Sequence, residues 1–236
     1  MSEFSVQQEM VKLRVVGLGI DVDSIDVSKY DEAIKRALNW AGRKFCIAVK
    51  WQFLIKPITI KTASGRTAYD FYGDNTGEYD FGELKSLMIY NATTGHWVPL
   101  VKCQESDIEA WDDDTAVLKG LPEYYAISGL VGAGQGVVDT AGVHIGGPTA
   151  DGAYDVKARY YRKIPDMVGD ADESLVTKVY GDAPLIEGAV YRFALDMSFV
   201  GASQDKFDRS IVEAQTVLPF DGPAYPTSLM EKEVQE

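Results

Sequence analysis

The sequence predicts an α+β protein, in which segments from the N- and C-terminal parts of the chain form a helical bundle around a central antiparallel β-sheet or sandwich domain. Residues 121–165 begin and end with β-preferring aromatic and aliphatic residues that alternate with polar ones, as in strands buried on one face. Residues 28–45 and 182–200 instead place apolar residues at steps of three and four, which makes a continuous stripe along a helix. We therefore expect a helical part from residues 1–50 and 166–216, a β domain over 51–165 and an extended C-terminal arm over 217–236.

The bulk composition limits the class of protein. A chain of 236 residues that is 46% hydrophobic can bury a substantial core in one or two compact units. It contains no apolar run that could span a bilayer, and its start lacks the basic region and apolar core of a signal peptide, so we expect a soluble protein that stays where it is made. The net charge of −13 argues against tight binding of nucleic acid, because affinity for phosphate comes from clustered Lys and Arg.

Helices are expected on both sides of the β domain. A short amphipathic helix covers residues 2–16, and the clearest helix begins at Ser28, whose hydroxyl can cap the first free backbone amides. After the sheet, a short helix over 170–181 begins with acidic residues, which we attribute to the helix dipole. A strong helix starts at Asp182, and another follows Ser203.

In the β domain, the sequence predicts short strands separated by turns. Strands are expected over residues 51–55, 58–62, 67–71, 84–90 and 96–100. Pro57 and Gly65 separate the first three in the manner of a β-meander, and residues 91–95 close a hairpin between the last two. Residues 121–127 and 154–165 are expected to be paired strands of one sheet.

An acidic run lies between the hairpin and the second half of the β domain. Residues 104–114 contain six carboxylates and no base, but the ligand spacing and central glycine of an EF-hand loop are missing. We interpret the run as a solvated acidic helix and loop rather than as a metal site. The glycine-rich residues 129–136 match neither a dinucleotide-binding fingerprint nor a P-loop, and we interpret them as a flexible insertion.

The sequence gives no sign of catalytic chemistry. Cys46 and Cys103 lack metal-type spacing and indicate reduced buried thiols. His96 and His144 are the only histidines, no nucleophile elbow accompanies them, and we assign them structural roles. No catalytic residue, cofactor or metal ion is therefore predicted, and the chain is not expected to be an enzyme.

Four sequence segments, taken in order, carry a resemblance to a known family. They are Ala-Ile-Lys-Arg-Ala-Leu-Asn at 33–39, Gly-Leu-Pro-Glu-Tyr-Tyr-Ala-Ile at 120–127, Tyr-Asp-Val-Lys-Ala-Arg-Tyr-Tyr-Arg-Lys-Ile-Pro at 154–165, and Ala-Pro-Leu-Ile-Glu-Gly-Ala at 183–189. With their order and spacing, the chain resembles the head-to-tail adaptor, or connector, proteins of tailed bacteriophages, including the tail tubular protein A type of short-tailed phages. The resemblance covers roughly residues 28–215. The glycine-rich loops over 129–147 look longer than is usual in that family.

The resemblance implies a virion structural protein that is assembled in the host cytoplasm. It implies a homo-oligomeric ring, usually a dodecamer, that binds the portal protein, joins it to a tail, nozzle or tail-tube protein, and serves viral genome ejection. The helical part would meet the portal or neighbouring copies, the β domain would face the tail, and the C-terminal arm would reach into the adjoining protein. Candidate partner-docking residues in the arm are Pro219, Phe220, Tyr225 and Pro226.

Duplex DNA would pass through such a ring without specific binding, because an acidic surface repels it, most strongly at low salt. We expect some of the acidic run to face the channel or a neighbouring subunit; a merely solvated surface is the alternative. The candidate residues are Asp107, Glu109, Asp112, Asp113 and Asp114.

Two rival interpretations stay open. One is a different virion part, such as a tail terminator or a capsid-associated protein. The other is a β-sandwich module that binds a sugar or peptide ligand through the exposed aromatic residues Tyr69, Tyr72, Tyr79 and Trp97. An enzyme would need polar groups that converge in a pocket.

Overall fold

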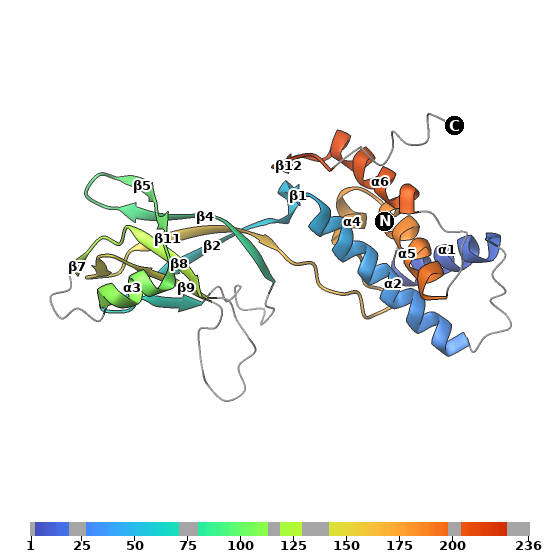
Figure 1. Ribbon diagram of the computed structural model, residues 1–236, viewed down its shortest axis with the longest axis horizontal. Coiled ribbons are helices and arrows are strands. Elements are labelled where there is room, and N and C mark those ends of the chain that lie inside the picture. The colour runs from blue at the N-terminus through green and yellow to red at the C-terminus, as the bar shows by residue number, and fades with distance from the viewer. Residues whose placement is uncertain are drawn as a thin grey trace. The chain divides into compact units, whose positions relative to one another are not determined.

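The computed structural model describes residues 3–18, 27–70, 80–112, 119–128, 142–197 and 204–225 (Figure 1). It mixes helices with antiparallel sheets, which confirms the predicted α+β class. The chain divides into two compact units, a helical unit of residues 1–54 and 163–236 and a β unit of residues 55–162. No helix within the described part of the chain is long and apolar enough to cross a membrane.

The helices of the helical unit are α1 (Phe4–Gly17), α2 (Val27–Ala48), α4 (Leu175–Val179), α5 (Ala183–Asp196) and α6 (Gln204–Val217). As the apolar stripe of α2 predicts, Ile34, Leu38 and Phe45 are fully buried, and α2 packs along α5. Gly188 of α5 lies where a Cβ atom would come within 2.8 Å of both Ala41 Cβ and the Phe207 ring. Only glycine therefore allows α2, α5 and α6 to approach this closely.

Helix α1 is fixed to the helical unit by apolar and polar contacts. Phe4, Val11 and Val15 are fully buried, and the buried Gln7 Nε2 donates hydrogen bonds of 2.8 Å to Thr177 Oγ1 and to Asp182 Oδ1. A buried amide that donates to two oxygens in this way fixes the rotation of α1, because each lost bond would leave a polar group in the core without that partner.

The acidic residues before α4 were predicted to interact with the helix dipole, but none of them lies in the first turn of α4. Ser174 caps α4, since its Oγ accepts a hydrogen bond from the Val176 N–H. The Asp172 carboxylate instead accepts from the N–H groups of Val168 and Gly169, at 2.7 and 2.8 Å, and these bonds lower the pKa of Asp172. The expectation for Asp172 is wrong because this residue closes the turn that precedes the helix.

The chain leaves α2 through Trp51, which organises the end of the helical unit. Strand β1 (Lys50–Trp51) pairs antiparallel with β12 (Phe220–Asp221), and a 3₁₀ turn over Gln52–Leu54 follows. The fully buried Trp51 ring stacks on Phe45, with 4.9 Å between centroids, and its Nε1 donates to the Phe45 carbonyl at 2.9 Å. The expected strand over 51–55 is therefore wrong, because pairing with β12 ends at Trp51 and the next strand begins at Ile55.

The β unit contains two four-stranded sheets. Sheet one has the order β2-β11-β4-β5 and sheet two the order β3-β9-β8-β6. The strands are β2 (Ile55–Lys61), β3 (Ala68–Asp70), β4 (Phe81–Asn91), β5 (His96–Pro99), β6 (Val101–Lys102), β8 (Tyr124–Ser128), β9 (Gly142–Gly146) and β11 (Asp155–Arg162), and β7 (Lys119–Gly120) pairs with β10 (Thr149–Ala150) in a separate parallel ladder. Residues of both sheets share one core, which includes Leu87, Val143 and Tyr160. The two sheets therefore form a sandwich.

Helix α3 (Glu105–Asp112) makes a third layer over sheet two. Val143 and Ile145 of β9 point into the sandwich core, so Gly142, His144 and Gly146 point to the opposite face. Ile108 of α3 is buried against this face, and a Cβ atom on Gly146 would come within 2.9 Å of Ile108 Cγ2. Glycine at this position lets the helix lie close to the strand.

Most strands lie where the sequence predicts them, but the predicted pairing of these strands is wrong. The expected partners over 121–127 and 154–165 lie in different sheets, since β8 pairs with β9 and β6 whereas β11 pairs with β2 and β4. The meander is also wrong, because β2 and β3 belong to different sheets and the turn at Gly65, with φ +74°, carries the chain between them. Pro57 lies within β2 rather than ending a strand, which is tolerated because β2 is at the edge of its sheet.

The expected hairpin is confirmed. β4 and β5 pair antiparallel from Met88 opposite Pro99 to Asn91 opposite His96. In the loop, Asn91 Oδ1 accepts a hydrogen bond from the Thr93 N–H at 2.9 Å, and Gly95 adopts φ +71°. Asn and Gly thus provide the two features that this turn requires.

Candidate interaction surfaces

The outer face of sheet one is the first candidate surface. In β11, Val156, Ala158 and Tyr160 are buried, so the residues between them point away from the sandwich core. The register with β2, β4 and β5 places outward residues of these strands beside them. We call this surface the open sheet face and define it by Lys61, Lys85, Met88, Tyr90, Trp97, Lys157, Arg159 and Tyr161, all of which are exposed or half-buried.

The open sheet face combines aromatic rings with cations. Lys157 Nζ lies 4.4 Å from the centroid of the Trp97 ring, which in turn lies 5.4 Å from the Tyr90 ring. Lys85 Nζ lies 5.9 Å from the Tyr161 ring, so two separate cation–π pairs lie on one sheet surface. Its tryptophan, its tyrosines and Arg159 are of the residue types that are enriched at binding interfaces.

The charge of this face has the opposite sign to that of the chain. Its four cations, Lys61, Lys85, Lys157 and Arg159, are accompanied on the same face by the carboxylates of Glu83 and Asp155. Asp155 Oδ1 lies 3.8 Å from Lys61 Nζ and partly neutralises its charge. The positive charge of the face is therefore concentrated at Lys157 and Arg159. Because the chain as a whole carries a net charge of −13, this basic surface differs in charge from the chain average and can attract an acidic partner.

Sequence reasoning missed this surface. The signal is the spacing of Lys157, Arg159 and Tyr161 along one face of β11, but the strand that places Trp97 beside Lys157 cannot be identified without the sheet order. The pairing of β4 between β11 and β5 brings these residues together.

Helix α3 carries the first part of the acidic run and is the second candidate surface. Asp107 and Glu109 are exposed, and Asp107 Oδ2 accepts a hydrogen bond from the Gln104 N–H at 3.1 Å, which caps the helix. Glu105 instead reaches back toward sheet two, with Oε1 3.6 Å from His144 Nε2. The run is thus helical as expected over its described part. Asp112 ends α3, and its side chain lies outside the described residues together with Asp113 and Asp114.

The titratable residues that could carry chemistry lie apart from one another. His96 is exposed at the start of β5, on a different sheet from His144. Cys46 and Cys103 are reduced thiols and are half-buried, whereas we expected them to be buried. Burial, with a smaller effect of the Asp107 charge, raises the pKa of the Cys103 thiol. In the described ranges, no three His, Cys, Asp or Glu side chains are grouped so that they could hold a metal ion.

The exposed aromatic residues expected for a ligand-binding module are not all exposed. Tyr69 is only 3% exposed, and its hydroxyl donates to the Arg66 carbonyl at 2.6 Å, so its predicted exposure is wrong. The ring instead fills the sandwich core. Trp97 is half-buried on the open sheet face, and Tyr72 and Tyr79 lie outside the described residues.

The described part of the expected C-terminal arm is bonded to its own helical unit. Val217 is the last residue of α6, the exposed Pro219 accepts a hydrogen bond from the Gln52 N–H at 3.0 Å, and Phe220 pairs with Trp51. Tyr225 donates its N–H to Gln215 Oε1 at 3.2 Å and its hydroxyl to Asp208 Oδ1 at 2.9 Å. These bonds attach the segment through Tyr225 to the helical unit, whereas an extended arm was expected from residue 217. Pro226 and the residues after it lie outside the described part.

We expect Tyr225→Phe to loosen this attachment. Asp208 is only 4% exposed, so loss of its hydroxyl donor should lower the free energy of unfolding by about 1 kcal/mol. Burial and then the bond to Asp208 raise the pKa of Tyr225 from 10.0 to about 12. The folded chain therefore keeps this proton where the unfolded chain has lost it, and the contribution to stability is complete below pH 10 and is lost between pH 10 and about 12.

Urea unfolding of both chains at several pH values measures this difference. The gap in stability between the original chain and Tyr225→Phe should be constant at neutral pH and should narrow between pH 10 and about 12. A gap that does not depend on pH would show that the hydroxyl does not titrate as the structure requires.

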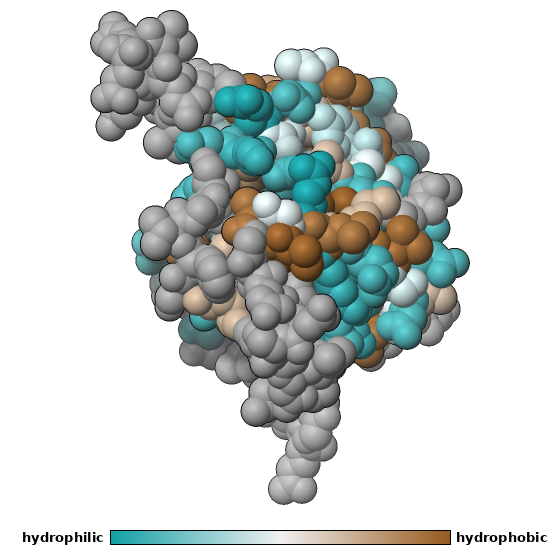
Figure 2. Space-filling model, turned by 90° about the vertical axis from the view of Figure 1, so that its right-hand side faces the viewer, coloured by the Kyte–Doolittle hydropathy of each residue, from teal (hydrophilic) through white to brown (hydrophobic). Residues whose placement is uncertain are grey.

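A third candidate surface is the outer side of α1. Val6, Met10 and Leu13 follow the helical spacing and are 42%, 38% and 72% exposed. Figure 2 shows hydrophobic side chains gathered in a band on the face of the helical unit that it displays. A helix with apolar residues on both sides has a second surface that can be covered by a partner.

Comparison with protein families places the chain among the phage adaptor proteins. The matching model is that of the SU10 adaptor protein, it covers residues 10–223, and the chain therefore belongs to this family. No curated protein matches the chain. The family identifies a structural component of a phage virion with a head-to-tail adaptor role, which confirms the family-level resemblance read from the sequence.

Proposed function

We propose that this chain assembles as a ring, of dodecameric type, between the portal and the tail of a phage and lets DNA pass during ejection. The observation that carries the proposal is the family match, which spans both units and ends just before Tyr225. We also propose that it is an adaptor of the tail tubular protein A type, assembled in the host cytoplasm, and that its role is structural rather than enzymatic.

The two units would meet different partners. The helical unit would dock on the portal, where the exposed apolar side of α1 offers a surface that a partner can cover. The β unit would face the tail protein, and the residues after Tyr225 would extend into the adjoining protein. This division of roles is supported by the separate core that each unit has.

The acidic surface would keep DNA from binding while it passes. With a net charge of −13, the chain repels phosphate, and the repulsion weakens as salt screens it. Exposed carboxylates such as Asp107 and Glu109 would contribute, either toward the channel or toward a neighbouring copy.

Light scattering of the chain alone and with the portal ring of its own phage tests the proposal. We expect the mass of the portal to rise by several multiples of 26.0 kDa, because many copies bind to one ring. A chain that stays at 26.0 kDa beside an unchanged portal would contradict the adaptor role and would favour a ligand-binding module.

A further inference from the structure

We propose that the open sheet face of one copy binds helix α3 of a second copy, so that the β units join head to tail. This inference rests on the proposed ring and adds the contact that closes it. It needs a surface that no described helix or strand of its own unit covers, a second surface of opposite charge, and a geometry that repeats.

The open sheet face meets the first condition. The inner face of sheet one is covered by sheet two, and sheet two is covered by α3 on its other side. On the outer side of sheet one, Arg159 of β11 is exposed. Met88 and Tyr90 of β4 and Trp97 of β5 are half-buried on the same side. Partly exposed aromatic residues grouped on one face mark an interaction surface.

Helix α3 meets the second condition. It exposes Asp107 and Glu109, and no basic residue occurs among residues 105–112, whereas Lys157 and Arg159 lie on the open sheet face. Opposite charges on two surfaces of one chain steer two copies into a single orientation. Duplex DNA is a poorer occupant for the same face, because Glu83 and Asp155 lie among its cations and the chain as a whole is acidic.

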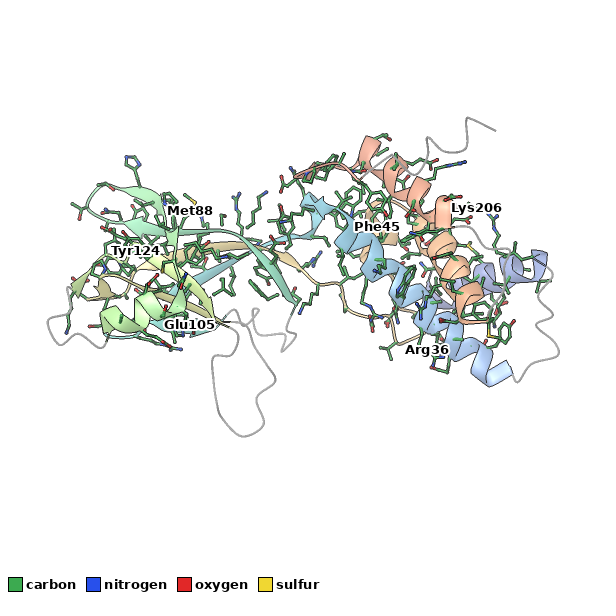
Figure 3. All side chains as sticks on the ribbon, in the orientation of Figure 1. Arg36, Phe45, Met88, Glu105, Tyr124 and Lys206 are labelled. Atoms are coloured by element: carbon green, nitrogen blue, oxygen red, sulfur yellow. The ribbon has the colours of Figure 1, made fainter. Side chains whose placement is uncertain are left out.

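The layer order meets the third condition. The open sheet face and α3 are the two outer layers of the same β unit, and Figure 3 labels Met88 on the first side and Glu105 on the second. One copy therefore cannot join its own two surfaces, but each copy can offer one surface to each neighbour. A contact between two different patches repeats from copy to copy and gives a ring when the rotation closes.

Charge exchange tests this contact in the full chain. Arg159→Glu and Glu109→Lys each place like charges opposite one another, and each should raise the concentration of chain at half assembly by about tenfold or more. The double variant exchanges the two charges and should assemble nearly as well as the original chain. Lys102→Glu in the edge strand β6, and Glu123→Lys beside that strand, make the same charge changes outside both surfaces and should assemble like the original chain.

Assembly is measured by sedimentation velocity, for the chain alone and for the chain mixed with the portal of its own phage. Failure of both single variants with rescue by the double variant supports the contact. Single variants that assemble like the original chain overturn this contact and leave the adaptor role intact. Absence of assembly by the original chain in both settings overturns both proposals. Retention of duplex DNA that is lost in Arg159→Glu, without any change in assembly, assigns the face to nucleic acid and overturns the contact.

Discussion

Trp51→Ala should lower the free energy of unfolding of the helical unit by about 3–5 kcal/mol, the range for removal of a fully buried large aromatic residue. The Trp51 ring stacks on Phe45, with 4.9 Å between centroids, and meets the Phe220 ring edge-on at 6.3 Å. Its removal leaves a cavity between the end of α2 and the β1–β12 pair and deprives the Phe45 carbonyl of the indole donor. It should also release the C-terminal segment.

Urea unfolding followed by far-UV circular dichroism measures this effect, because the helical unit contains all of the described helices except α3. Trp51→Phe keeps an aromatic ring but loses the 2.9 Å bond to the Phe45 carbonyl, so it should cost clearly less. Ile47→Ala changes an 80% exposed side chain of the same helix and should have almost no effect. Equal stability of Trp51→Ala and Ile47→Ala would contradict the proposed packing.

Tyr160→Ala should destabilise the β unit by a similar amount, about 3–5 kcal/mol, because a fully buried ring of the sandwich core is lost. The Tyr160 ring contacts Phe81 with 5.3 Å between centroids, and its hydroxyl donates to Asp80 Oδ1 at 2.7 Å. Lys56 Nζ lies 3.2 Å from the other oxygen of Asp80. The residue therefore links β11 and the start of β4 by an apolar and a polar contact.

Hydrogen exchange of the β4 and β11 amides in urea reports on this unit, and Tyr160→Phe is the matched control. The phenylalanine keeps the ring and leaves Asp80 beside Lys56, so it should cost only about 1 kcal/mol. A loss in Tyr160→Phe as large as that in Tyr160→Ala would show that the hydroxyl, rather than the buried ring, stabilises the sandwich.

The helices could be predicted from the sequence because their signals are local. The apolar stripe of α2 and the proline at the start of α5 specify both the helix and the buried face within one segment. The close approach of three helices at Gly188 could not be predicted, since a glycine inside a helix gives no indication of which side chains lie beside it.

Strand pairing was less predictable for a physical reason. Alternation in β11 shows that Val156 and Ala158 face a core, but any strand with the same period could lie beside it. The hairpin of β4 and β5 was predictable because Asn91 and Gly95 identify its loop. The candidate surfaces follow the same division: the acidic run is visible in one segment, whereas the open sheet face needs residues of β4, β5 and β11 together.

A three-dimensional reconstruction by electron microscopy of the chain bound to the portal of its own phage tests the central claim most directly. The account predicts a closed ring of copies on the portal, in which Arg159 of each copy lies against α3 of the next and the helical unit contacts the portal. A portal without the chain, or single copies bound without contact to one another, would contradict it.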